Sequence, residues 1–350
     1  MIKRMLTWSG LIPTLNRGNI LRNSLPTFIN QTRLPKQIIV VDASDSWQES
    51  KVEILGTIAP TKPEIEWIYL HSDIKSLTYQ GNLGAEKCSS DILFLLDDDS
   101  FPYPNYAEKV LKVYESDREG IVGGVCGFLV NTLPNGINQE FSKTLRSASE
   151  KRRGIFVQAV QRLWYQERFF LPYDGKYHIY DTSKIAKEVP IQDLALLHGC
   201  RMSYRISAFR EVGGFDTILI NKGTDVDLSY RVSQKYALVL ACDALIYHDE
   251  TPVARLKRYN MACLVVANAL VLYILKASQE QNIVLTTYLF AITRCLLELA
   301  RDAAKPQRGF PHARGAFYAL RSLPKFLKLD RDRLREWYPE YQRSVLQSKQ

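Results

Sequence analysis

The chain has 350 residues, 46% hydrophobic and 24% charged, a balance typical of folded proteins that excludes wholesale disorder. Its net charge of +9 is concentrated at one end, because residues 251–350 hold 17 Lys and Arg against 7 Asp and Glu while residues 1–250 are nearly neutral. Six singly spaced cysteines form no C-x-x-C pair, which excludes a zinc ribbon or redox motif and predicts buried, reduced thiols.

The first 130 residues alternate short β-rich runs with amphipathic stretches. This rhythm predicts an α/β domain whose mostly parallel sheet is covered by helices on both faces. Ligands of such sheets bind beyond the carboxyl ends of the strands, so the polar residues at those ends should converge on one rim. The expected strands are 5–12, 37–41, 66–70, 92–96 and 121–130, the expected helices 19–30, 47–58, 77–88 and 106–114, and the polar strand ends Thr14, Asn16, Asp42 and Asp97–Asp99.

Residues 131–190 break this rhythm and are rich in Lys, Arg and aromatic residues. Such an insertion is either a functional loop region or a small helical excursion without a role in binding. Regular structure is expected again in helices over 206–212 and 225–236 and in a strand over 237–247 that ends at His248. We therefore predict a catalytic domain over 1–250, with the insertion at 131–190, and a basic, wholly helical region over 251–350 with a break at 305–309.

Two apolar stretches, 261–275 and 283–300, are too short or too interrupted for the roughly 20 apolar residues of a membrane-spanning helix. We predict packed or interfacial helices there and no transmembrane segment. The N-terminus does not resemble a signal peptide, since Pro13, Asn16 and Arg17 interrupt its apolar run. The basic tail could attract an anionic membrane surface or nucleic acid, or form a solvated bundle or an oligomer interface.

Three consecutive acids, Asp97, Asp98 and Asp99, follow an unbroken apolar strand. In extended backbone the first and third share a face, so two carboxylates can point into one cleft. Hard oxygen ligands suit Mg²⁺ or Mn²⁺, which commonly bridge carboxylates and substrate phosphates. The alternative is a solvated Asp-rich turn before Phe101 and Pro102, but the position at a buried strand end favours the metal site.

Asp225 and His248 are further candidates for chemistry. Asp225 opens a helix, where it is either a first-turn acid stabilised by the helix dipole or an aimed general base, and spacing alone does not decide. His248 becomes a metal ligand only if its strand end meets the Asp99 rim. No Ser-His-Asp or Cys-His arrangement and no P-loop is present, and Gly81-Asn82-Leu83-Gly84 lacks the third glycine of a dinucleotide fingerprint.

In order along the chain, several segments resemble motifs of the family 2 glycosyltransferases, which have the GT-A fold. The likeness runs from Gly10 to about His248. It departs from the family where Gln80 replaces an arginine and Thr224 a glutamate, and the Q-x-x-R-W motif of processive synthases is absent. The segments are Ile12-Pro13-Thr14-Leu15-Asn16-Arg17, Val40-Val41-Asp42, Gln80-Gly81-Asn82, Asp97-Asp98-Asp99, Gly213-Gly214-Phe215-Asp216, Thr224-Asp225 and His248.

The resemblance implies a metal-dependent, inverting transfer of a single sugar from a nucleotide-activated donor such as a UDP- or dTDP-sugar. Asp99 and His248 are expected to hold Mn²⁺ or Mg²⁺, Asp225 to act as the base, and Gly199–Arg205 and Gly213–Asp216 to line the acceptor side. The residues expected to bind the donor are Pro13, Thr14, Asn16, Arg17, Asp42, Gln80, Asn82, Asp97 and Asp98.

The expected partners are the nucleotide-sugar donor, a saccharide or lipid-linked acceptor, and an anionic membrane surface or a second copy of the chain at residues 251–350. No nucleic acid partner is expected. The resemblance also suggests surface-polysaccharide or glycolipid assembly in the cytoplasm, with peripheral attachment to the inner face of the cell membrane. A sugar-nucleotide-forming transferase would need a glycine-rich N-terminal loop that residues 13–17 lack. A non-catalytic carbohydrate- or nucleic-acid-binding scaffold is the remaining alternative.

Overall fold

The computed structural model describes residues 5–134, 180–249, 251, 253, 256–277, 282–304 and 309–348. Its chain divides into two compact units. The first contains the described residues up to 216 and those from 225 to 254, and the second contains 217–224 and those from 255 onward. Most of the predicted insertion, residues 135–179, lies outside the described residues.

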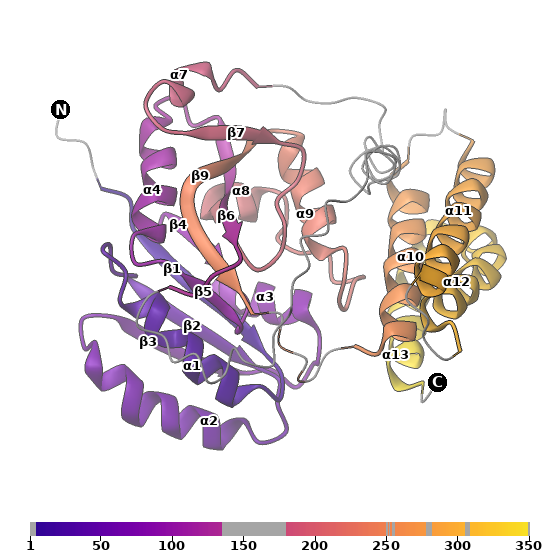
Figure 1. The fold of residues 1–350 in the computed structure, drawn as a ribbon, viewed down its shortest axis with the longest axis horizontal. Helices are drawn as coiled ribbons and strands as arrows, with labels where there is room; N and C mark the ends of the chain where they lie inside the picture. Colours follow the sequence, from indigo (N-terminus) through magenta and orange to yellow (C-terminus); the bar gives the residue numbers. More distant parts are fainter. Residues whose placement is uncertain are drawn as a thin grey trace. The chain divides into compact units, whose positions relative to one another are not determined.

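The first unit is built on one mixed sheet in the strand order β3-β2-β1-β4-β8-β6-β9-β5, with β7 also paired to β9 (Figure 1). Strands β3, β2, β1 and β4 are parallel neighbours, as are β6 and β9, whereas β8, β5 and β7 join antiparallel. The strands are β1 (Trp8–Thr14), β2 (Gln37–Asp42), β3 (Glu66–His71), β4 (Ile92–Leu95), β5 (Ser100–Pro102), β6 (Val122–Val130), β7 (Ile191–Leu194), β8 (Met202–Arg205) and β9 (Ala237–His248).

Helices cover both faces of this sheet because successive strand residues point to opposite sides. In β2, Ile38 and Val40 enter one core while Ile39 and Val41 enter the other. The first core also takes residues from α1, α2 and α4, and the second takes residues from α3, α8 and α9. The helices of this unit are α1 (Gly18–Ile29), α2 (Trp47–Glu53), η1 (Ile54–Ile58), η2 (Ala59–Thr61), α3 (Leu77–Glu86), α4 (Tyr106–Ser116), α7 (Ser183–Ala186), α8 (Ile206–Glu211) and α9 (Thr224–Ser233).

The short strand β5 brings the acid triplet next to the end of β9. It pairs antiparallel with β9, and this register sets Ser100 opposite His248. The carbonyl oxygen of Asp99, the residue before Ser100, accepts a hydrogen bond from the Asp249 backbone N–H at 3.0 Å. The carboxyl ends of β4 and β9 are thereby joined beside the acid triplet.

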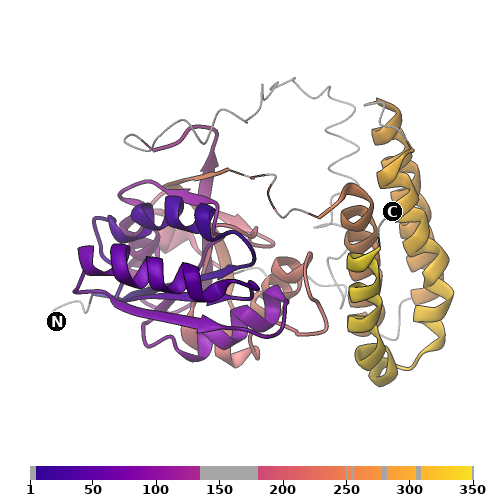
Figure 2. The ribbon, with the colours of Figure 1, turned by 90° about the horizontal axis from the view of Figure 1, so that it is seen from below.

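Among its described residues, the second unit has the helices α10 (Arg258–Lys276), α11 (Ile283–Ala304), α12 (Pro311–Lys328) and α13 (Arg331–Gln347) (Figure 2). Helices α10 and α12 pack closely, since a Cβ atom at Gly315 would lie 2.3 Å from the carbonyl oxygen of Tyr259. Asp330 begins α13 by accepting a hydrogen bond from the Arg333 backbone N–H at 2.9 Å, an N-cap contact. The predicted break falls between the end of α11 at Ala304 and the start of α12 at Pro311.

Two of these helices are long and apolar enough to cross a membrane by length and composition. Over its most apolar window, helix α10 is 83% buried, as a core helix would be, whereas α11 is only 22% buried. The absence of a transmembrane segment therefore stays a prediction.

Candidate active site

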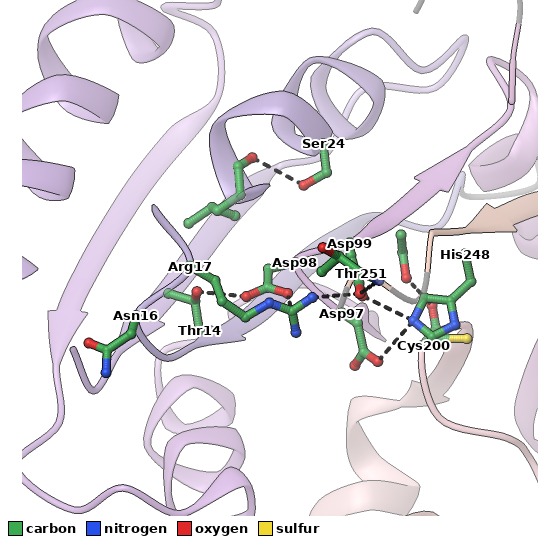
Figure 3. Close-up of polar contacts among 12 residues, drawn as sticks. Thr14, Asn16, Arg17, Ser24, Asp97, Asp98, Asp99, Cys200, His248 and Thr251 are labelled. Atoms are coloured by element: carbon green, nitrogen blue, oxygen red, sulfur yellow. Dashed lines mark hydrogen bonds and ion pairs between the residues drawn. The ribbon is translucent and has the colours of Figure 1, made fainter. Parts of the chain in front are cut away.

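The acid triplet and the end of β9 form a cluster that could hold a metal ion. The Nε2 atom of His248 lies 3.0 Å from Asp99 Oδ1 and 3.7 Å from Asp97 Oδ2 (Figure 3). One ligand atom from each of the three side chains falls within 4.8 Å of the others. The end of β9 thus lies beside Asp99, the arrangement under which we expected His248 to be a metal ligand.

Asp99 is the most constrained of the three acids. Its buried carboxylate also accepts hydrogen bonds from Arg17 at 2.5 Å and from the Thr251 backbone N–H at 3.1 Å. Burial alone would raise the pKa of Asp99, but the hydrogen bonds and charges of His248 and Arg17 outweigh it and hold the pKa below its usual range. Asp99 is therefore ionised and rigidly aimed, as a metal ligand should be.

Asp98 faces the opposite side from Asp97 and Asp99. Its buried carboxylate accepts a hydrogen bond from Thr14 Oγ1 at 2.7 Å and pairs with Arg17 NH1 at 3.1 Å. Burial raises the pKa of Asp98 to about 7, against the opposing effect of the Arg17 charge. Asp98 ties the acid triplet to the loop after β1.

The loops that follow β1 and β2 lie against each other. Pro13 and Thr14 end β1, and Asn16 has a left-handed backbone (φ 54°) that Asn tolerates better than most residues. Its backbone N–H donates to Ser44 Oγ at 2.6 Å. Asp42 is fully buried, where its carboxylate accepts hydrogen bonds from the hydroxyl of Tyr69 at 2.6 Å and the backbone N–H of Ser44 at 2.8 Å.

The side chains of Gln80 and Asn82, both on α3, form hydrogen bonds with the backbone of other segments. Gln80 is buried, and its Nε2 atom donates to the carbonyl oxygens of Thr14 at 2.9 Å and Val41 at 2.8 Å. Asn82 donates from Nδ2 to the Phe215 carbonyl oxygen at 2.9 Å and accepts from the Phe215 backbone N–H at 2.8 Å. These contacts place Gln80 against the strand ends that lead into the loops after β1 and β2, and Asn82 against the Gly213–Asp216 turn.

Asp225 lies in the first turn of α9 and is only partly buried. Its Oδ2 atom accepts a hydrogen bond from the Gly199 backbone N–H at 3.1 Å, and Oδ1 accepts one from the Val226 backbone N–H at 3.0 Å. Asp227, two residues further along α9, pairs instead with Arg231 at 2.7 Å. Asp225 is thus oriented by two backbone donors, one of them on a separate segment.

The turn at Gly199 and Cys200 connects Asp225 with the acid triplet. The carbonyl oxygen of Cys200 accepts a hydrogen bond from Ser100 Oγ at 2.9 Å, next to Asp99. Burial raises the pKa of the Cys200 thiol well above its usual value, and the negative charges of Asp97, Asp99 and Asp225 add to the effect. Through Gly199 and Cys200, Asp225 is thus linked to Ser100, the neighbour of Asp99 in the acid triplet.

Three contacts of the site had no signal in the sequence. The backbone N–H of Thr251, the hydroxyl of Ser100 and the left-handed backbone of Cys200 (φ 70°) hold the rim together. Backbone donors and a three-residue strand leave no residue-type pattern, and Cys200 was classed only as a buried thiol within an acceptor-lining segment.

The donor atoms present fit a divalent ion such as Mn²⁺. Two carboxylates and one imidazole are a hard and borderline set that suits this metal. The partly exposed Asp97 leaves room on the open side for further oxygen ligands. Arg17 and Thr251 hold the second oxygen of Asp99, so its first oxygen stays directed at the ion position.

The mixed sheet and this rim define a glycosyltransferase of the GT-A fold. The family model described as glycosyl transferase family 2 matches residues 9–211, more than half of the chain, and the chain belongs to that family. No curated protein matches the chain.

Solved structures support the same fold. One is described as a mannosyltransferase from Pyrobaculum calidifontis in complex with GDP-Man and Mn²⁺, at 13% identity and a TM-score of 0.52, with 99% of this chain and 89% of that chain covered. GalNAc-T7 with UDP, GalNAc and Mn²⁺ is 13% identical with a TM-score of 0.54, and the match covers 96% of this chain and 59% of that chain. S. aureus TarS is 11% identical with a TM-score of 0.51, and the match covers 97% of this chain and 53% of that chain. The chain thus spans little more than half of the last two.

Proposed function

We propose that this glycosyltransferase moves one sugar from a UDP- or dTDP-sugar to an acceptor hydroxyl, with inversion at the anomeric carbon and with Mn²⁺ or Mg²⁺ bound. The observation that carries the proposal is the cluster of Asp97, Asp99 and His248, with Asp225 linked to it by the hydrogen bonds at Gly199 and Cys200. Membership of family 2 and neighbours bound to nucleotide sugars with Mn²⁺ support it.

On the donor side, Asp97, Asp99 and His248 would hold the ion, which when bound neutralises the charge of the leaving diphosphate. Asp97 is the more exposed carboxylate and would also contact the donor ribose or sugar. Arg17 fixes the side chains of Asp98 and Asp99, because each of its two terminal nitrogens binds one of the two carboxylates. The loops at residues 13–17 and 42–44 would surround the nucleotide.

On the acceptor side, Asp225 would take the proton of the attacking hydroxyl. The acceptor oxygen forms a bond to the anomeric carbon, the bond from that carbon to the diphosphate oxygen breaks, and the diphosphate leaves with the electron pair. The Gly199 and Val226 N–H groups keep the carboxylate in one orientation through this step. A single displacement of this kind inverts the anomeric configuration.

The anomeric outcome tests the proposal directly. Incubation of the protein with Mn²⁺, a panel of UDP- and dTDP-sugars and a panel of sugar acceptors should give a product whose new linkage, read by proton NMR, is inverted relative to the donor. Retention of configuration would contradict a single displacement on Asp225.

We further propose that the acceptor is a saccharide or a lipid-linked saccharide, used in surface-polysaccharide or glycolipid assembly in the cytoplasm. The excess of basic residues over 251–350 supports a site of action near an anionic membrane. Cell extracts separated into soluble and membrane fractions would test the location, and a deletion strain would test the product: unchanged surface glycans and glycolipids would contradict this role.

A further inference from the structure

The exposed face of α11 is apolar. Five of its six exposed large apolar residues, each between 46% and 60% exposed, follow each other at spacings of three and four and form one stripe along the helix. They are Leu285, Leu289, Ile292, Leu296 and Leu299. No charged residue lies between Ile283 and Thr293.

The face of α11 that packs inside the helical unit is mixed. Thr287, Glu298 and Asp302 are buried there beside Phe290 and Ala291. Glu298 pairs with Arg294 at 2.8 Å, and Asp302 pairs with His312 of α12 at 2.6 Å. A surface helix in water turns most of its large apolar residues toward the core, whereas α11 exposes most of its own. The outer side of α11 therefore fits apolar surroundings better than water.

Helix α12 packs beside α11 and exposes basic residues among aromatic ones. Its exposed positions fall on one face, and the helix contains no Asp or Glu. This mixture is typical of helices that lie in a membrane interface, where cations contact headgroups and rings lie at the boundary. The residues are Arg314, Phe317, Tyr318, Arg321, Lys325 and Lys328.

We propose that the α11–α12 face binds the surface of an anionic lipid bilayer, with α11 lying in the plane of the interface and its apolar stripe among the acyl chains. A second copy of the chain fits less well, because its α12 face would bring the same positive charges together. A spanning α11 would carry Arg294, Glu298 and Asp302 through the hydrocarbon. The proposal does not depend on the transferase assignment.

Vesicle flotation of the full chain tests this surface. Binding is expected to vesicles of phosphatidylcholine with phosphatidylserine, weakly or not at all to phosphatidylcholine alone, and to fall at high salt. The substitutions Leu289→Asp with Leu296→Asp should abolish it. Changing Arg321, Lys325 and Lys328 to Ala should lower partitioning about 100-fold, since each basic residue near the surface contributes about fivefold.

Matched controls keep the test specific. Val52→Asp changes an even more exposed apolar residue on α2, and Arg333→Ala with Arg343→Ala removes charge from α13, so both should bind like the original protein. Thermal melting checks that each variant is folded. The proposal is overturned if the original protein fails to float at low salt, or if the stripe variant floats normally. A stripe variant that changes a dimer to a monomer without affecting flotation would assign the face to a second copy.

A separate observation concerns the segment that leads into Asp225. Residues 217–224 belong to the helical unit, and two buried amides of that unit bind their backbone. Gln342 of α13 donates to the Ile218 carbonyl oxygen at 2.6 Å and accepts from the Ile220 backbone N–H at 3.0 Å. Asn268 of α10 donates to the carbonyl oxygens of Asn221 at 2.6 Å and Lys222 at 2.8 Å.

The bound backbone ends in an unusual turn. Lys222 and Gly223 both have left-handed backbones, with φ of 57° and 73°, immediately before α9 begins at Thr224. A left-handed lysine costs about 1–2 kcal/mol and persists only where its surroundings fix it. Asn268 supplies that restraint, and its own Oδ1 atom accepts a hydrogen bond from the buried hydroxyl of Tyr338.

We infer that Asn268 and Gln342 are positioning residues for the transfer reaction, because they fix the turn from which Asp225 projects. This inference rests on the proposed role of Asp225 as base. It gives the C-terminal helices a part in catalysis through their hold on residues 217–224, independent of membrane binding.

Kinetics of Gln342→Leu and Asn268→Leu test it. We expect kcat to fall about 10- to 100-fold, because misplacement of a reacting group by about 1 Å has effects of that size, while the KM for the donor stays within about twofold. Gln342→Glu, which keeps the acceptor for Ile220 N–H, should retain more activity than Gln342→Leu. Gln347→Leu, at an exposed position of the same helix, is the control.

The outcomes separate the two claims. Folded leucine variants with normal kcat would overturn the positioning role, whereas a fall in thermal stability alone would show only a structural part. If Asp225→Asn itself keeps normal turnover, the assignment of Asp225 as the base fails, whatever the Asn268 and Gln342 variants show.

Discussion

The substitution Asp225→Asn removes the proposed base while keeping its shape. In the structure, each carboxylate oxygen accepts one backbone N–H, from Gly199 at 3.1 Å and from Val226 at 3.0 Å. An asparagine can accept only one of the two, so one N–H loses its partner at a cost of about 1–3 kcal/mol in folding. The loss of general-base help should lower kcat by a factor of about 10²–10⁴.

Steady-state kinetics with a fixed acceptor and varied donor separates these effects. We expect a large fall in kcat, a nearly unchanged KM for the donor, and a melting temperature lowered by no more than about 10 °C. Asp227→Asn is the control on the same helix, because Asp227 pairs with Arg231 and should affect stability but not turnover. Near-normal transfer by a folded Asp225→Asn protein would refute the reasoning.

Three further predictions concern the rim. Asp99→Asn and His248→Ala should each weaken Mn²⁺ binding at least tenfold in calorimetry, because each removes one of three protein ligands; unchanged affinity would place the ion elsewhere. Burial raises the pKa of Asp98 to about 7, so between about pH 4 and 7 this side chain is protonated more often in the folded protein than in the unfolded chain. Its contribution to the free energy of unfolding therefore falls as pH rises through this range. In chelator, the melting temperature of Asp98→Asn relative to the original protein should therefore rise from pH 5 to pH 8, and a constant difference would contradict the shift. Asn82→Ala should loosen the Phe215 backbone that it binds through two hydrogen bonds, raising the KM for the acceptor more than that for the donor, as kinetics with each substrate varied would show.

The sequence predicted the parallel part of the sheet well. The apolar runs that became β1, β2, β3 and β4 alternate with amphipathic helices, and this periodicity is a local property of the chain. It also named Asp97, Asp99 and His248 as residues that could meet at the carboxyl ends of the strands, and the structure brings these three side chains together.

The antiparallel strands were not predicted, since β5, β7 and β8 have only three or four residues each. Such short strands are stabilised by their partners in the sheet and show no period of their own. For the same reason the pairing of Ser100 with His248, which joins the metal-ligand candidates, could not be read in advance.

In the helical region, helix periodicity indicated the helices but not what their polar residues do. Asn268 was visible only as an interruption of an apolar run. Its role follows from the carbonyl groups of residues 221 and 222, 46 and more positions away in the chain. The exposed apolar stripe of α11 likewise emerges only when burial is known for each residue.

The claim on which the account depends is that one cation, held by Asp97, Asp99 and His248, binds the diphosphate of a nucleotide. Thermal melting of the protein with UDP and dTDP, each with and without Mn²⁺, measures this directly. A nucleotide at 100 times its dissociation constant should stabilise the fold by about 2.7 kcal/mol, only when Mn²⁺ is present and not in Asp99→Asn. Equal stabilisation in chelator, or none by any nucleoside diphosphate, would contradict it.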